Sequence, residues 1–193
     1  MVRGSTFCPA RGTVGPVSVI QAGSLLIATP QIIDGVFGRS VVVVVDHDSE
    51  GTIGVVLNQP SLELVADHLG HLSGDGLDDE RLYIGGPVQP EVGVCLSVGE
   101  GKFNIEIPGL SAGLTDIGER PTPNQRWRVY AGYAGWSPRQ LAAEVEGGGW
   151  WVAESQVSDL LYADPSKLWQ DAVARQRDAV AIFAHYPTNP RIN

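Results

Sequence analysis

The sequence has few cysteines and none in the arrangement that a structural zinc site requires. Cys8 lies in a start rich in Pro and Gly, and Cys95 lies inside an apolar run. Structural zinc sites use closely spaced Cys and His pairs, so we expect no zinc and no other resident metal. We also expect no cofactor. Two cysteines in such different surroundings favour a reduced, cytoplasmic protein, and 193 residues are enough to fold without a disulfide.

Long apolar runs are also missing. The longest apolar runs, such as residues 41–45, are far shorter than the roughly 20 residues that cross a bilayer. The first 18 residues carry Arg3 and Arg11 but no apolar stretch of the signal-peptide type. We therefore expect no membrane attachment, and we interpret residues 1–19 as a disordered extension ahead of one domain, residues 20–193.

Positive charge is scarce. Thirteen Lys and Arg face 22 Asp and Glu, which gives a formal net charge of −9. This charge repels polyanions at long range, so nucleic-acid binding requires a local basic patch. The densest basic stretch, residues 120–128, places Arg126 and Arg128 beside Trp127, and it is more typical of a solvated loop than of a phosphate-binding face. We expect no direct nucleic-acid binding.

Apolar runs and turn signals predict an α+β fold. Because strands and helices do not alternate regularly, a doubly wound α/β sheet is disfavoured. Five consecutive β-branched residues at 41–45 predict a strand buried on both faces, paired in a hairpin with residues 52–57. The other predicted strands are residues 24–28, 82–84, 92–98, 103–107, 127–133, 150–153 and 179–184, and residues 108–125 are a predicted loop.

Three helices are predicted from capping signals. The first starts at Ser61 and continues through Leu62, Val65, Ala66 and Leu69, which are spaced i, i+3, i+4, i+7. The second has Ser137 as N-cap, Pro138 at N1 and Gln140 completing a capping box, and it ends near Glu146. The third starts at Asp164-Pro165 and continues through Leu168, Trp169, Ala172 and Val173.

Two groups of residues resemble metal ligands. Asp46, His47, Asp48 and Glu50 supply carboxylates and an imidazole, but the same residues form polar hairpin turns by bonding their own backbone, and we favour the turn. His68 and His71 are three residues apart, without an evident third ligand. We favour a role for this pair at the C-terminal end of the first helix, where the helix dipole favours a protonated imidazole.

Glycines and aromatic residues mark the candidate ligand site. Gly85-Gly86-Pro87 follows a strand, as phosphate loops do, but the spacing matches neither nucleotide-binding motif, and we favour a tight backbone crossing. Aromatic residues near glycines either form a stacking pocket or fill a core, and we favour the core. This group contains Tyr130, Tyr133, Trp136, Trp150 and Trp151. If a ligand binds, the candidate residues are Gly85, Gly86, Pro87, Tyr133 and Trp136.

An ordered set of segments resembles one known family. They are residues 23–30 (GSLLIATP), 41–45 with His47, 54–60 (GVVLNQP), 83–88 (YIGGPV), 132–138 (GYAGWSP) with Gln140-Leu141, Asp164-Pro165 with Leu168-Trp169, and 183–193. Together they resemble the AlgH/YqgE family of uncharacterised bacterial proteins. The resemblance implies a single α+β domain with coiled, bifurcated, mostly antiparallel sheets flanked by a few helices. It implies no agreed activity and no catalytic residues, although one relative is described as a transcriptional regulator of exopolysaccharide synthesis.

Three functional hypotheses follow. No nucleophile motif is evident, so we favour a non-enzymatic binding or interaction protein, with a regulatory role among its uses, that engages a partner protein or a small ligand. The alternative is an enzyme or small-ligand binder with a pocket near residues 85–88 and 132–136. A DNA-binding regulator is the weakest hypothesis, because of the net charge of −9.

Overall fold

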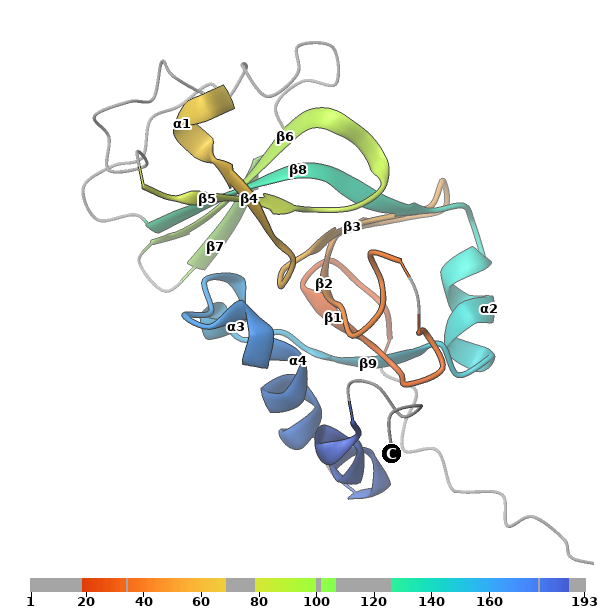
Figure 1. Cartoon of the computed structure of the whole chain (residues 1–193). Coiled ribbons are helices and arrows are strands. Elements are labelled where there is room, and N and C mark those ends of the chain that lie inside the picture. The colour runs from red at the N-terminus through yellow and green to blue at the C-terminus, as the bar shows by residue number, and fades with distance from the viewer. Residues whose placement is uncertain are drawn as a thin grey trace, which may run out of the picture.

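A computed structural model describes residues 19–33, 35–68, 79–99, 102–106, 126–176 and 178–187. The strands in this part of the chain join into one branched sheet, in the order β4-β5-β8-β3-β2-β1-β9, with β6 beside β8 and β7 beside β6 (Figure 1). The strands are β1 (Ser24–Ala28), β2 (Val41–His47), β3 (Thr52–Val56), β4 (Pro60–Leu64), β5 (Arg81–Ile84), β6 (Val88–Gly99), β7 (Lys102–Glu106), β8 (Arg126–Trp136) and β9 (Trp150–Glu154). The helices are α1 (Val65–His68), α2 (Gln140–Glu146), α3 (Val157–Leu160), α4 (Pro165–Ala174) and the 3-10 helix η3 (Asp178–His185).

The central strands β1 and β2 are buried on both faces. Odd-numbered residues such as Leu25 and Val43 belong to one apolar cluster, and even-numbered ones such as Leu26 and Val42 belong to a second. This alternation is the period of two of a β-strand. The prediction that residues 41–45 form such a strand, paired with the next one, is confirmed, because β2 pairs antiparallel with β3.

Helices cover the two faces of the sheet unequally. Leu168, Trp169, Ala172 and Val173 of α4 pack into the first cluster, together with Leu160 of α3. The second cluster includes Leu141 of α2. Figure 1 shows α2 at one side of the sheet and α3 with α4 at the other. None of the helices in the described ranges is long and apolar enough to cross a membrane.

The sheet branches along β8. Near its start, β8 pairs antiparallel with β6 and parallel with β5; at its end, it pairs antiparallel with β3. Gly132, between the two regions, has φ +69, a conformation that favours glycine. The mostly antiparallel, bifurcated α+β architecture is therefore confirmed.

The start of α4 follows its predicted signal. Asp164 is the N-cap and accepts a hydrogen bond from the Ser166 N–H, and Pro165 occupies the first turn. All four predicted apolar positions of this helix are buried. The Trp169 indole N–H donates to the carbonyl of Ala28 over 2.8 Å, which anchors α4 to β1.

The predicted helix from Ser61 is wrong. Residues 60–64 form β4, which pairs with β5, and among the described residues of this segment the four of α1 alone are helical; Leu69 lies outside the described ranges. Leu62 is 93% exposed, whereas Val65 is buried. The apolar spacing was therefore coincidental at Leu62, because pairing with β5 determines the conformation of this segment.

The predicted strand at residues 179–184 is also wrong. The segment is the 3-10 helix η3, which packs on α4. Val180 and Ala184, four residues apart, face the first apolar cluster, whereas Ile182 is 74% exposed. A short apolar run does not distinguish a strand from a helix by periodicity alone.

The remaining strand predictions agree with the structure within a few residues, with β6 and β8 longer than expected. The predictions for residues 1–18, Cys8, His71 and residues 108–125 lie outside the described residues.

Candidate functional site

A close crossing of two backbones lies at the branch of the sheet. A Cβ added at Gly85 would lie 2.2 Å from the carbonyl oxygen of Gly132, and one at Gly86 would lie 2.1 Å from the carbonyl carbon of Tyr133. Both distances are far below van der Waals contact, so only glycine fits at either position. Gly85 also donates its N–H to the carbonyl of Ala131. The crossing therefore fixes the position of Pro87, the next residue along the chain.

Beside this crossing is a cavity of about 480 Å³. Its wall combines the residue before β6, the end of β8, helix α2 with the turn that follows it, the start of β9 and the segment between β1 and β2. The residues that line it are Gln31, Ile32, Phe37, Pro87, Gly135, Trp136, Gln140, Glu144, Gly147, Gly149 and Trp150. We call this cavity the aromatic pocket.

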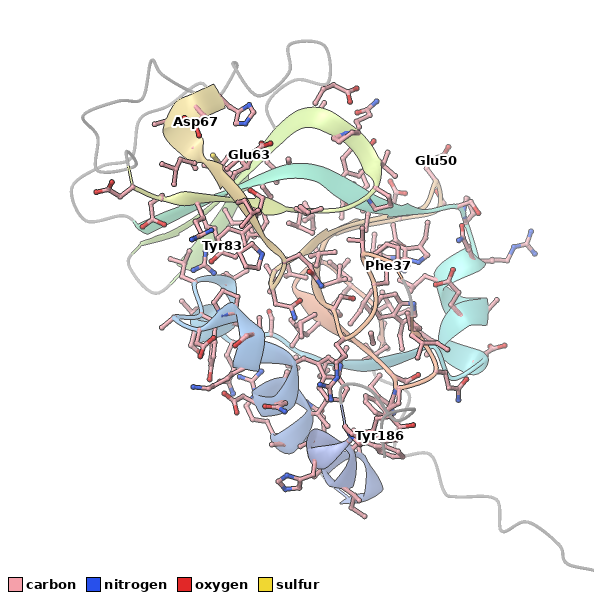
Figure 2. All side chains as sticks on the ribbon, in the orientation of Figure 1. Phe37, Glu50, Glu63, Asp67, Tyr83 and Tyr186 are labelled. Carbon is pink, nitrogen blue, oxygen red and sulfur yellow. The ribbon has the colours of Figure 1, made fainter. Side chains whose placement is uncertain are left out.

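Three aromatic rings form one side of the aromatic pocket. Trp136 and Trp150 meet edge to face, with ring centroids 5.9 Å apart and planes at 84°. Phe37 lies edge to face on Trp150 at 5.6 Å and tilted on Trp136 at 6.2 Å. Figure 2 shows Phe37 beside α2, well apart from Tyr83 and Tyr186. Edge-to-face pairs are a favourable arrangement, so the rings hold one another in place.

Glu144 links the two tryptophans. Its Oε2 accepts hydrogen bonds from the indole N–H of Trp136 over 2.9 Å and of Trp150 over 2.8 Å. Its Oε1 accepts a third from the side-chain amide of Gln140 over 2.9 Å. Three neutral donors thus fix the carboxylate in the wall of the aromatic pocket.

Helix α2 supplies both polar residues because they are four apart and share one face. Gln140 also accepts from the backbone N–H and the hydroxyl of Ser137, so one half of the predicted capping box forms. The predicted N-cap is nevertheless wrong. The helix begins at Gln140, and Arg139, in the left-handed region at φ 66, is its N-cap. The Pro138-Arg139 turn separates Ser137 from the helix.

A model of the family described as AlgH-like matches residues 25–181. The chain belongs to the AlgH-like family. It is 36% identical over 182 residues to a "UPF0301 protein" of Streptomyces avermitilis, with 89% of this chain and 94% of the relative covered.

Solved structures agree with this assignment. The fold is similar to the crystal structure of a Corynebacterium diphtheriae protein, with a TM-score of 0.75, 27% identity, and 89% of this chain and 95% of the other covered. It is also similar to the solution structure of the AlgH protein from Pseudomonas aeruginosa, with a TM-score of 0.56, 26% identity, and coverage of 79% and 86%. The family resemblance predicted from the sequence is confirmed, and none of these names states an activity.

The predicted site residues of this AlgH-like chain divide into two groups. Pro87 and Trp136 line the aromatic pocket, whereas Gly85, Gly86 and Tyr133 are not among its lining residues. Gly85 and Gly86 are buried in the crossing, and the Tyr133 hydroxyl donates to the Gln89 side chain. Trp136 is only 6% exposed, as the core interpretation of the aromatics predicts. It is therefore both core and pocket wall.

Sequence reasoning missed Phe37, Gln31 and Glu144. The available signal for Glu144 was its position four residues after Gln140, on a helix that directly follows Trp136. Phe37 lies in the turn between β1 and β2, and no local pattern connects that turn with α2.

The candidate metal ligands do not gather into a site. Asp48 accepts from the backbone N–H groups of Glu50 and Gly51, which is the predicted polar turn, and Asp46 accepts from the N–H of His47. His68 lies 2.7 Å from Glu63. Within the described ranges, no three His, Cys, Asp or Glu side chains lie close enough to hold a metal ion.

Proposed function

We propose that this AlgH-like chain is a cytoplasmic binding protein and that its ligand site is the aromatic pocket. The observation that carries the proposal is the composition of the wall. Apolar rings form one side of a cavity that Gln31, Gln140 and Glu144 also line. Small-molecule sites are typically concave and mostly apolar, of about 300–1,000 Å³, with a few well-placed polar groups.

The bonding of Glu144 supports binding over catalysis. Among the described residues that line the aromatic pocket, it is the only one with an ionisable side chain. Its carboxylate already accepts three hydrogen bonds from Trp136, Trp150 and Gln140. A general base needs a lone pair directed at the substrate, whereas this group is positioned as a fixed element of the wall.

The test is a fragment screen read by the indole N–H signals of Trp136 and Trp150 in nuclear magnetic resonance spectra, assigned with single Trp→Phe variants. The library contains equal numbers of cationic, neutral and anionic fragments. We expect at least one charge class to shift both indole signals saturably, because both N–H groups lie on Glu144 in the pocket wall.

A matched pair of variants localises the binding. Phe37→Leu removes a ring from the aromatic pocket, and Phe183→Leu removes a partly exposed ring that contacts Trp151 outside the pocket. The first variant should weaken binding by about tenfold, the equivalent of about 1.4 kcal/mol, and the second should leave it unchanged. If no fragment shifts the indole signals, or if both variants behave alike, the proposed function is wrong.

A further inference from the structure

The negative charge of Glu144 has no cationic partner in the described part of the chain. The ion pairs there join Glu63 to His68, Asp164 to Lys167 and Asp159 to Arg175. The three donors to Glu144 are neutral indole and amide groups. Hydrogen bonds from neutral groups orient a carboxylate without supplying a positive charge, so no cationic side chain in the described ranges balances Glu144.

We infer that the aromatic pocket binds a small organic cation whose charged end is a methylated ammonium group. This inference rests on the proposed function, since it names the class of ligand for the same pocket. Aromatic rings attract cations through the negative potential of their faces, and cages of such rings are the common way of recognising quaternary ammonium groups. Phe37, Trp136 and Trp150 all line the pocket. The ring of Trp150 lies nearly perpendicular to the other two, which are tilted by 36° to each other.

The hydrogen bonds of Glu144 favour a methylated cation over a primary amine or a guanidinium. A carboxylate offers about four acceptor positions, and three of these are occupied by Trp136, Trp150 and Gln140. A primary ammonium brings three N–H donors and a guanidinium brings five, which leaves most of them unsatisfied in an apolar cavity. A quaternary ammonium has no N–H groups, so it gains from the charge and the rings without this cost.

The size and charge of the molecule agree with this class of ligand. The cavity of about 480 Å³ is large enough for a small organic ion. The formal net charge of −9 raises the local concentration of cations and their rate of association. The net charge also acts against anionic ligands of the same shape.

The test compares choline with 3,3-dimethylbutan-1-ol, which has the same shape but no charge. Binding of each to the full chain is followed at low salt by the indole signals of Trp136 and Trp150. We expect choline to bind about tenfold more tightly than the neutral alcohol, through the carboxylate of Glu144 and the aromatic rings together. Ethanolamine, a primary amine with the same hydroxyethyl group, should bind more weakly than choline.

Glu144→Gln keeps the shape of the side chain and removes its charge. In this variant the preference for choline over the alcohol should fall to about threefold, because the attraction of the carboxylate is lost and that of the rings remains. The comparison within the wild type needs no variant, so it remains decisive if Glu144→Gln folds poorly. Equal binding of choline and the alcohol overturns the inference and leaves the proposed function standing. No binding of either also overturns it, and the fragment screen then decides the proposed function separately.

Discussion

The guanidinium of Arg175 forms a two-point ion pair with the carboxylate of Asp159, with N–O distances of 2.7 and 3.0 Å. The Asp159 side chain is completely buried, and that of Arg175 is 30% exposed. Asp159 also accepts the backbone N–H of Gln156 at the start of α3. Since Arg175 is the C-cap of α4, the pair ties α3 to α4 beside the first apolar cluster.

Arg175→Gln should destabilise the protein by about 3 kcal/mol, the lower end of the cost of breaking a buried ion pair. The variant leaves a buried carboxylate without its counter-charge, and the partial exposure of Arg175 limits the loss. Urea unfolding measures the difference. Lys167→Gln is the control, because it breaks a pair with Asp164 whose side chains are 66% and 46% exposed. Equal losses in the two variants would contradict the burial argument.

Gly86→Ala should prevent stable folding or lower the free energy of unfolding by more than about 4 kcal/mol. Losses of this size are found only for severe core defects. Its Cβ would lie 2.1–2.4 Å from backbone atoms of Tyr133 and Ala134, and backbone at a strand crossing does not give way. Gly135→Ala, in β8 close to the crossing, is the matched control, since its nearest neighbours lie 3.7 and 3.8 Å away. We expect that variant to have wild-type stability. Soluble yield and thermal unfolding distinguish the two, and similar behaviour would refute the crossing.

The sequence predicts those elements whose local signal and tertiary contacts agree. The β-branched run at residues 41–45 is buried on both faces, and Asp164-Pro165 starts α4 as its capping chemistry requires. The prediction fails where pairing between distant strands overrides the local signal. Leu62 is the example, because it lies in an edge strand that pairs with β5 instead of in a helix.

The aromatic pocket is predictable only in part, for a related reason. Trp136 and Pro87 were found because glycines and aromatics mark their segments. Phe37 reaches the pocket through the pairing of β1 with β2 and β9, which brings distant segments together. No local sequence pattern specifies which residues of these strands pair with one another. The pocket wall therefore follows from the fold and not from any one motif.

High pH should destabilise the protein through Tyr130. Burial raises the pKa of its hydroxyl well above the ordinary value of 10.0, while the unfolded chain titrates near that value. A raised folded-state pKa contributes stability that is complete below pH 10 and is lost as the pH rises above it. The loss from this group is about 1.4 kcal/mol per pH unit.

Tyr130→Phe tests this dependence. The variant loses the hydrogen bond to the carbonyl of Leu160 and should be less stable than wild type at pH 8. Between pH 10 and 11, however, its stability should fall less steeply. Urea midpoints at the three pH values provide the measurement, and parallel curves for the two proteins would show that Tyr130 does not control the dependence.

Trp136→Ala should lower the free energy of unfolding by about 3–5 kcal/mol, the usual effect of deleting a buried aromatic side chain. Trp136 is 6% exposed, belongs to the same apolar cluster as Leu141, and donates to Glu144. Its loss removes two ring contacts and one of the donors that fix the carboxylate. Leu62→Ala, at a side chain 93% exposed, should stay within about 0.5 kcal/mol of wild type in the same urea titration. If Trp136→Ala costs less than about 1 kcal/mol, below the range for core aromatics, the residue is not a structural wall of the aromatic pocket.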